Sequence, residues 1–216
     1  MANIELVIFD MDGLIFDTER IYYKAWQEAS KSHGYEMTWE VYTQIVARNS
    51  RYIEKTLKEI FGAELPYKAI EQMKRDLSNE MVRSEGIQIK KGLLELLDAL
   101  ETKGIKKAVA TSSQREKALN YLEMAGIKER FDDIICGDEV MESKPNPEIF
   151  VKVGSRLGAD PAHTLVLEDS RLGLEAGKKG DMKTVCIPDL VTPDEEMKRN
   201  ADHILESLDQ VITLLD

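Results

Sequence analysis

The sequence predicts an α/β protein with a doubly wound parallel sheet and a small helical domain inserted into it. Three observations support this fold class: short apolar runs of strand length recur, amphipathic helical segments separate most of them, and residues 18–86 contain one helical segment after another. We therefore expect a core domain of residues 1–17 and 87–216 and a helical domain of residues 18–86.

Five apolar runs have the length and the β-branched content of buried strands. They cover residues 6–9, 108–110, 134–135, 165–167 and 184–187. Strands that alternate with helices form a parallel sheet with helices on both faces.

Helical segments lie between the later strands. Residues 92–104 precede the second strand, whereas 115–126 and 147–158 follow the second and third strands and end in glycines suited to helix C-caps. Residues 207–216 are predicted to form a last helix that covers the sheet.

The inserted region breaks the alternation of strand and helix. Its helical segments cover residues 19–34, 39–47, 51–62 and 66–86, and glycines occur in both connections to the core, at positions 13, 86 and 92. Such connections suit a hinged domain.

Composition excludes some classes of partner. The formal net charge is -11, with a pI near 4.9, so duplex nucleic acid and anionic membranes would repel the chain. No apolar run has the length of a membrane span.

Cys136 and Cys186 each end an apolar run and are expected to be buried free thiols, as in a reducing compartment. We expect a cytoplasmic protein, without a leader segment, that acts as a monomer.

Polar side chains follow four of the predicted strands. Asp10 and Asp12 follow the first, Thr111-Ser112-Ser113 end the second, Lys144 comes after the third, and Glu168-Asp169-Ser170 end the fourth. Because the carboxyl ends of parallel strands form the ligand crevice, we expect these groups to converge. Each motif alone has a simpler explanation as a turn or a helix cap, but all four in this order indicate one site.

The chemistry of this set points to a phosphate. Asp10, Asp12 and Asp169 are oxygen donors, which select a hard cation such as Mg²⁺. The Thr111 hydroxyl and the Lys144 ammonium group suit a phosphoryl group. A carboxylate can attack phosphorus once a metal ion and a lysine screen the charge of the phosphate.

The four motifs resemble those of the haloacid dehalogenase superfamily, in its beta-phosphoglucomutase-like phosphatase branch with a Rossmann-like core and a helical cap. They read VIFDMDG, AVATSS, SKPNPEIF and LVLEDS. The similarity extends over nearly the whole chain, and it identifies residues 18–86 as the cap.

The resemblance implies a role for each site residue. Asp10 would be the nucleophile that forms an aspartyl phosphate, and Asp12 would act as general acid and then general base. Mg²⁺ would be held by Asp10, the Asp12 backbone carbonyl and Asp169, with Glu168 close by or acting through water. The phosphate-binding residues would be Thr111, Ser112 and Lys144.

The same resemblance leaves the reaction open between two types. Dehalogenase members lack the second aspartate, so Asp12 favours phosphoryl transfer. A beta-phosphoglucomutase-type sugar phosphomutase is the alternative, because Arg51 matches a phosphate-binding arginine of that enzyme. Against it, Tyr22 replaces a cap histidine and Arg48 replaces a glycine. We therefore expect a Mg²⁺-dependent phosphatase whose partner is a small phosphorylated metabolite, such as a sugar or polyol phosphate.

Two further points concern substrate specificity and the non-enzymatic alternatives to a phosphatase. The residues Asp17, Thr18, Tyr22 and Arg51 are predicted to select the substrate from the cap side. A receiver-like phosphoacceptor or a substrate-binding protein would be the non-enzymatic alternative, but a receiver carries its acceptor aspartate on a middle strand of a much shorter chain.

Overall fold

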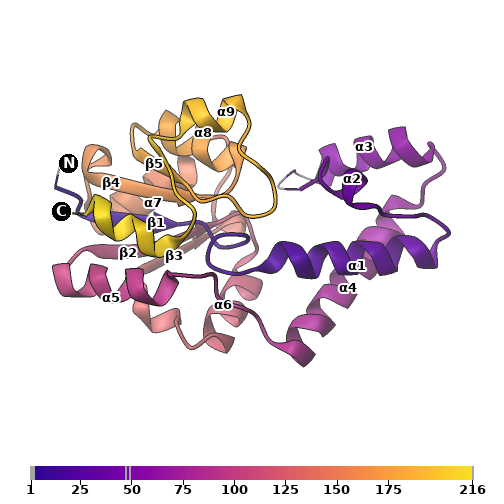
Figure 1. The fold of residues 1–216 in the computed structure, drawn as a ribbon, viewed down its shortest axis with the longest axis horizontal. Coiled ribbons are helices and arrows are strands. Elements are labelled where there is room, and N and C mark those ends of the chain that lie inside the picture. Colours follow the sequence, from indigo (N-terminus) through magenta and orange to yellow (C-terminus); the bar gives the residue numbers. More distant parts are fainter. Residues whose placement is uncertain (1–2, 47, 49, 216) are drawn as a thin grey trace. The chain divides into compact units, whose positions relative to one another are not determined.

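The computed structural model describes residues 3–46, 48 and 50–215, which fall into two compact units (Figure 1). Unit 1 consists of Met1–Asp17 and Ile87–Asp216, and unit 2 consists of Thr18–Gly86. The chain therefore leaves unit 1 after its first strand and re-enters it before its second.

Unit 1 is built on a parallel sheet with the strand order β3-β2-β1-β4-β5-β6. The strands are β1 (Leu6–Phe9), β2 (Lys106–Thr111), β3 (Asp133–Cys136), β4 (Thr164–Glu168), β5 (Lys183–Cys186) and β6 (His203–Ile204). The predicted fold class is confirmed, and all five predicted runs overlap β1 to β5. The short edge strand β6 was not predicted, because two residues carry no periodic signal.

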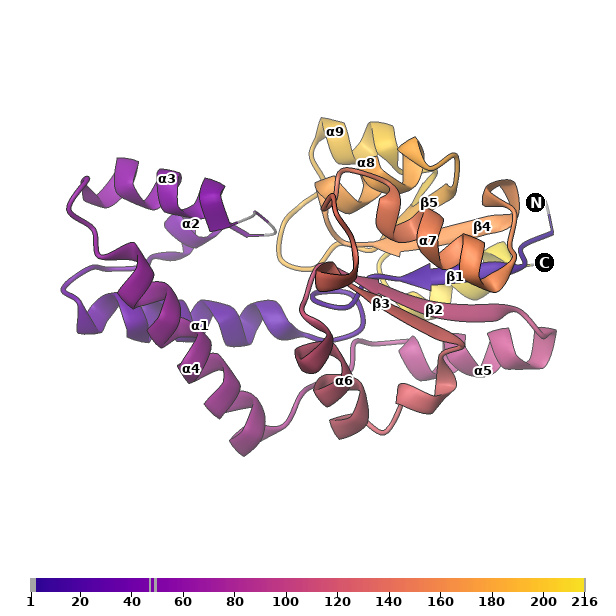
Figure 2. The same cartoon turned by 180° about the vertical axis from the view of Figure 1, so that it is seen from behind.

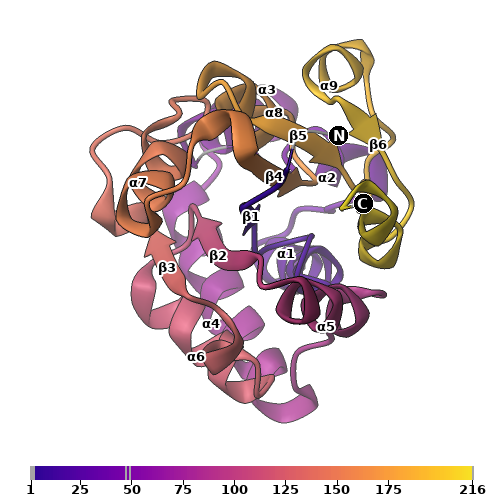
Figure 3. The ribbon, with the colours of Figure 1, turned by 90° about the vertical axis from the view of Figure 1, so that its left-hand side faces the viewer.

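Helices cover both faces of this sheet. They are α5 (Leu93–Lys103), α6 (Arg115–Met124), α7 (Glu148–Leu157), α8 (Arg171–Lys179) and α9 (Glu195–Asn200), with short 3₁₀ helices η1 (Lys128–Arg130), η2 (Gly137–Glu139) and η3 (Pro161–His163). Helices α5 and α6 lie on one face, whereas α7 and α8 lie on the other (Figures 2 and 3). Right-handed crossovers produce this arrangement when the chain reverses direction across a sheet.

One side of the core joins alternate residues of the strands to α7. Leu6 and Ile8 of β1 point to the same face, since side chains alternate along a strand, and they pack in one cluster with Phe150 and Val153. All four residues of β1 are buried, as expected for a central strand covered on both sides.

The chain end differs from its prediction. Residues 207–216 were expected to form an α-helix, but the structure shows a 3₁₀ helix, η4 (Leu208–Leu214), packed against α5. Its three consecutive β-branched residues, 211–213, disfavour an α-helix. Residue 216 lies outside the described residues.

Unit 2 contains the helices α1 (Thr18–Ser32), α2 (Trp39–Tyr42), α3 (Ser50–Phe61) and α4 (Tyr67–Glu85). Helices α1 and α4 form its main contact, in which the rings of Trp26 and Tyr67 stack with centroids 6.3 Å apart. The predicted helix 39–47 is shorter than expected, since α2 ends at Tyr42, and residue 47 lies outside the described residues. None of the helices in the described residues is long and apolar enough to cross a membrane.

Candidate active site

The strand order creates a switch point between β1 and β4. The chain proceeds from β1 to β2 and β3 on one side, then returns to β4 on the other side of β1. Ligands of open α/β sheets bind outside the carboxyl ends of the strands at such a point. Asp10 lies there, because it follows β1 directly and its backbone N–H donates to the Leu167 carbonyl of β4 at 3.0 Å.

Three charged side chains meet in a buried cluster at this point: Asp10, Lys144 and Glu168. The Lys144 Nζ atom lies 2.5 Å from Asp10 Oδ1 and 2.6 Å from Glu168 Oε1, and it also donates to the Ala110 carbonyl at 3.1 Å. The exposed fractions of the side chains are 11% for Asp10, 5% for Lys144 and 0% for Glu168. A buried carboxylate needs a partner of opposite charge, and here one lysine supplies it to two carboxylates.

Burial and neighbouring charges shift the proton affinities within the buried cluster. Burial raises the pKa of Asp10 to about 7; Lys144 opposes this rise and the Glu168 carboxylate adds to it. Burial alone would lower the pKa of Lys144, but Asp10 and Glu168 outweigh it and hold that pKa above its ordinary value. Lys144 is therefore cationic, and an additional cation beside Asp10 would favour its ionised form.

The Glu168 carboxylate is fixed on both of its oxygens. Its Oε2 atom accepts hydrogen bonds from the Ser170 N–H at 3.1 Å and the Ser170 hydroxyl at 2.8 Å, while Oε1 faces Lys144. The Ser170 hydroxyl oxygen in turn caps α8 by accepting from the Gly173 N–H at 3.1 Å. A Cβ atom on Gly173 would lie 1.8 Å from Glu168 Oε1, so this position requires glycine. Glu168 thus holds Lys144 in place.

A group of carboxylates in this region suits a hard cation. Asp10, Glu168 and Asp169 each place one oxygen so that the three lie within 4.8 Å of one another. Gly13, with a φ of +85°, makes room for Asp169, because a Cβ atom there would lie 2.2 Å from Asp169 Oδ2. A donor set of oxygens without histidine or cysteine is typical of Mg²⁺. The residues present therefore fit the predicted ion.

The predicted phosphate-binding turn lies at the carboxyl end of β2. Thr111 is the buried last residue of β2, and its hydroxyl oxygen accepts from the Ser113 N–H at 3.1 Å. Ser112 is exposed, and the Ser113 carbonyl accepts from the Gly137 N–H at 2.9 Å, which ties the turn to the end of β3. The structure brings this turn to the same edge of the sheet as Asp10, and its role in binding phosphate stays a prediction.

The Asp12 carboxylate lies in a second group of charges, here called the Asp12 cluster, together with Ser113 and Lys117. The Ser113 hydroxyl donates to Asp12 Oδ2 at 2.6 Å, and Lys117 Nζ lies 3.0 and 3.1 Å from the two carboxylate oxygens. The exposed fractions of the Lys117 and Asp12 side chains are 28% and 20%, so this cluster is more exposed to solvent than the buried one. The metal contact predicted for the Asp12 backbone carbonyl stays a prediction.

The sequence placed Ser113 in the motif that ends the second strand but assigned it no role of its own, and it did not single out Lys117. The Thr-Ser-Ser motif also suited a helix cap, yet α6 begins at Arg115, and Gln114 at its N-cap makes no side-chain hydrogen bond to the helix. The sequence indicates the position of Lys117 only weakly. Lys117 lies in the first turn of α6, which follows β2, and such a turn lies at the same edge of the sheet as the end of that strand. A third contact was also missed: Lys90 pairs with the buried Asp189 at 2.5 Å.

The predicted specificity residues are divided between the two units. Asp17 is the last residue of unit 1 before the insertion, whereas Thr18 and Tyr22 lie on α1 of unit 2. The Lys74 ammonium group lies 3.9 Å from the centroid of the Tyr22 ring. Arg51 is exposed in the first turn of α3. The role of these residues in specificity stays a prediction.

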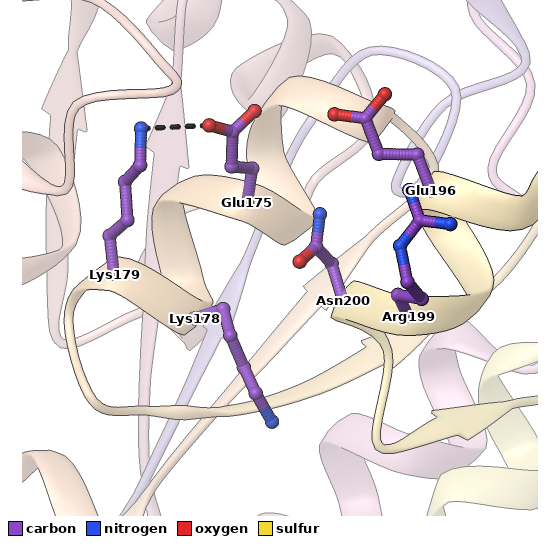
Figure 4. Close-up of a pocket in the computed structure, with 6 residues that line it drawn as sticks. All are labelled: Glu175, Lys178, Lys179, Glu196, Arg199 and Asn200. Carbon is purple, nitrogen blue, oxygen red and sulfur yellow. Dashed lines mark ion pairs between the residues drawn. The ribbon is translucent and has the colours of Figure 1, made fainter.

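A separate groove of about 390 Å³ lies between α8 and α9 (Figure 4). The residues that line it are Glu175, Lys178, Lys179, Glu196, Arg199 and Asn200. Lys179 pairs with Glu175 at 2.7 Å and Lys178 with Asp202 at 2.9 Å, so carboxylates already balance these cations. None of the predicted site residues lines this groove, and we assign it no function.

Comparison with known proteins identifies the family. The sequence pattern of the family described as "Haloacid dehalogenase-like hydrolase" matches residues 7–187, which include both Asp10 and Asp169. The chain belongs to this family.

Relatives and solved structures agree with that assignment. The "Putative phosphatase YhcW" of Bacillus subtilis (strain 168) is 33% identical over 95% of this chain and 92% of its own length. The "Phosphorylated carbohydrates phosphatase" of Thermotoga maritima is 33% identical over 84% of this chain and 83% of its own length. The crystal structure of a "putative beta-phosphoglucomutase" from Thermotoga maritima has a TM-score of 0.81 at 28% identity and covers 98% of both chains.

Membership of the haloacid dehalogenase-like hydrolases confirms the resemblance read from the four motifs. It makes the protein an enzyme, so the receiver-like alternative is set aside. Fold alone does not define a reaction, and the chemistry has to be argued from the site.

Proposed function

We propose that this haloacid dehalogenase-like hydrolase is a Mg²⁺-dependent phosphatase that hydrolyses a small phosphomonoester through an aspartyl phosphate on Asp10. The observation that carries the proposal is the buried cluster, in which Asp10 lies at the switch point of the sheet with Lys144 against it and Asp169 nearby. A carboxylate placed between a lysine and other acids suits nucleophilic attack on an anionic phosphate.

The relatives support the same reaction class. Two proteins that are 33% identical to this chain are named phosphatases, and one of them is named for phosphorylated carbohydrates. A sugar or polyol phosphate is therefore the substrate class that we propose for this chain.

In the first step, Asp10 would attack the phosphorus atom. A new bond forms between an Asp10 carboxylate oxygen and phosphorus, and the bond from phosphorus to the ester oxygen breaks. Asp12 would donate its proton to that departing oxygen, which leaves as an alcohol. Lys144 and the Thr111–Ser112 turn would hold the phosphoryl oxygens.

In the second step, water would attack the phosphorus atom of the aspartyl phosphate. The Asp12 carboxylate accepts the proton from this water, and the bond between Asp10 and phosphorus breaks. Inorganic phosphate leaves, while Asp10 is again a carboxylate and Asp12 is again protonated. Bound Mg²⁺, held by Asp10, Asp169 and the Asp12 backbone carbonyl, would screen the repulsion between the carboxylate and the phosphate.

We assign substrate choice to the residues predicted from the sequence, namely Asp17, Thr18, Tyr22 and Arg51. Substitutions at Tyr22 or Arg51 should change which phosphate ester is preferred without removing the need for Mg²⁺. An unchanged substrate profile would contradict this assignment. The cytoplasmic location and the monomeric state stay predictions from the sequence.

A sugar phosphomutase is the second candidate, since a solved structure named for that activity resembles this chain. Tyr22 and Arg48 stand where the mutase pattern has histidine and glycine, so we favour hydrolysis.

The test is phosphate release from a panel of sugar, polyol and nucleoside monophosphates, with and without Mg²⁺. We expect metal-dependent release from at least one ester, and no release by the Asp10→Asn variant. A coupled assay for isomerised sugar phosphate runs in parallel, and isomerisation without net release would replace the phosphatase by a mutase. A wild-type protein that is inactive in both assays would contradict the proposed function.

A further inference from the structure

The Asp12 cluster forms a closed ring of hydrogen bonds among three side chains. Lys117 Nζ donates to both carboxylate oxygens of Asp12 and also to the Ser113 hydroxyl oxygen at 2.8 Å. The Ser113 hydroxyl then donates its own proton to Asp12 Oδ2 at 2.6 Å. Donors and acceptors match throughout the ring when Asp12 is ionised, because lysine only donates and an ionised carboxylate only accepts. This is the form that Asp12 takes once it has given its proton to the leaving oxygen. The plane of the Asp12 carboxylate is thereby fixed from two directions.

Lys117 and Ser113 are themselves held by further contacts. The Lys117 ammonium group lies 5.2 Å from the centroid of the Tyr121 ring, one turn further along α6. The Ser113 backbone is tied on both sides, through its N–H to Thr111 and through its carbonyl to Gly137. The ring therefore joins Asp12 to the turn that we propose as the phosphate-binding site.

We infer that Lys117, acting with Ser113, is a positioning residue that orients the Asp12 carboxylate toward the leaving oxygen of the substrate. This inference rests on the proposed function, in which Asp12 delivers a proton in the first step. Proton delivery depends on the geometry of the donor, and a carboxylate that rotates freely reaches the oxygen in only a fraction of its orientations. Lys117 acts through Asp12 and needs no contact with the substrate.

The inference is tested by the dependence of the reaction on the leaving group. A sugar or polyol phosphate expels an alkoxide that needs a proton, whereas p-nitrophenyl phosphate expels a stabilised phenolate that leaves without one. For Lys117→Met we expect kcat/KM to fall about 10²-fold on the best alkyl phosphate of the panel but less than about 5-fold on p-nitrophenyl phosphate. Because kcat/KM reports the steps up to and including the first irreversible one, here the departure of the alcohol, it separates this role from activation of water.

Related variants sharpen the test. Lys117→Arg keeps a cation and hydrogen-bond donors and should recover part of the alkyl phosphate activity, and Ser113→Ala should show a smaller loss with the same substrate pattern. The double variant Lys117→Met with Asp12→Asn should be no slower than Asp12→Asn alone, because residues that act as one unit are not additive.

The matched control is Lys128→Met. Lys128 is a similarly exposed lysine that pairs with Glu123 at 2.6 Å, also next to α6 but away from Asp12. This variant should keep wild-type kinetics on both substrates. Equal losses on alkyl and p-nitrophenyl phosphate in Lys117→Met, no loss on either, or losses that add to those of Asp12→Asn would each overturn the inference.

A second measurement separates this inference from the proposed function. The NMR signal of the Asp12 carboxyl carbon, assigned by its absence in Asp12→Asn, should shift in Lys117→Met and stay unchanged in Lys128→Met. An unchanged signal in Lys117→Met overturns the positioning role whatever the activity. The signal could instead shift while the wild-type protein hydrolyses neither substrate. That result would confirm the contact between Lys117 and Asp12 but contradict the proposed function, and the contact would then have no role in catalysis.

Discussion

The two lysine–carboxylate clusters at the carboxyl edge of the sheet use the same residue types in different surroundings. In the buried cluster, Lys144 is 5% exposed and lies against Asp10 and Glu168, whereas in the Asp12 cluster Lys117 is 28% exposed and lies against Asp12. Burial makes the two acids of the first cluster depend on its lysine, because removal of Lys144 leaves both buried carboxylates without a counter-charge. The second cluster is partly solvated, so its ion pair contributes less to stability. We therefore expect the loss of Lys144 to lower stability more than the loss of Lys117.

The largest expected effect comes from the nucleophile of the buried cluster. Asp10→Asn replaces the attacking carboxylate by a neutral amide, which is a poor nucleophile, and we expect kcat to fall on the order of 10⁴-fold or more on every ester. Phosphate release with the wild type and the variant measures it. Substantial activity in a verified Asp10→Asn sample would show that another residue is the nucleophile.

The next effect separates the two lysines by their contribution to stability. Lys144→Met leaves Asp10 and Glu168 buried side by side, and we expect the metal-free protein to lose about 3–5 kcal/mol of unfolding free energy at neutral pH. Lys117→Met breaks a partly exposed pair and should cost about 1 kcal/mol or less. Urea unfolding of the two variants gives both values. Equal losses would show that burial does not distinguish the two clusters.

The next effect concerns activity and comes from a glycine in α8. Gly173→Ala places a Cβ atom where Glu168 now lies and should displace Lys144, which lowers activity about 10²-fold or more. Gly154→Ala in α7 is the matched control, because its nearest neighbour would lie at 3.6 Å, an ordinary contact. Alanine is favoured over glycine inside a helix, so the control should keep its activity and gain about 0.5–1 kcal/mol. Kinetics and thermal unfolding of both variants are the measurements, and full activity in Gly173→Ala would refute the fixed position of Glu168.

The smallest effect concerns two groups that lie outside both clusters. Burial raises the pKa of the Cys136 and Cys186 thiols to about 12 in each case. A raised pKa means less thiolate, on the order of one part in 10⁴ at about pH 8. We expect neither thiol to react with iodoacetamide in the folded protein, and both to react after denaturation. Rapid labelling of the folded protein, detected by intact mass, would contradict this.

The sequence predicted the parts of the site that follow strands. Asp10, Thr111 and Glu168 could be placed at one edge because each comes at the end of an apolar run, and parallel strands bring such ends together. Lys144 was found through its motif, although its motif does not show that it bridges Asp10 and Glu168. That contact depends on how a loop after β3 folds back over the sheet.

Other features could not be predicted for physical reasons. Lys117 lies on a helix, and its contact with Asp12 depends on the rotation of α6 about its axis, which no local pattern fixes. The edge strand β6 depends on pairing with β5 rather than on its own two residues. The last segment has apolar residues that suggested an α-helix, but its three consecutive β-branched residues disfavour that helix. It forms the 3₁₀ helix η4 instead.

Detection of a phosphoryl group on Asp10 would test the proposed covalent mechanism directly. The enzyme is mixed with its best ester and Mg²⁺, quenched in acid within the first turnover, digested and analysed by mass spectrometry. We predict that the peptide containing Asp10 carries one added phosphoryl group, and that Asp10→Asn shows none while its Lys144 and Glu168 peptides are unmodified. Phosphoryl transfer to another residue, or product formation without any phosphorylated peptide, would contradict the assignment of Asp10 as the nucleophile.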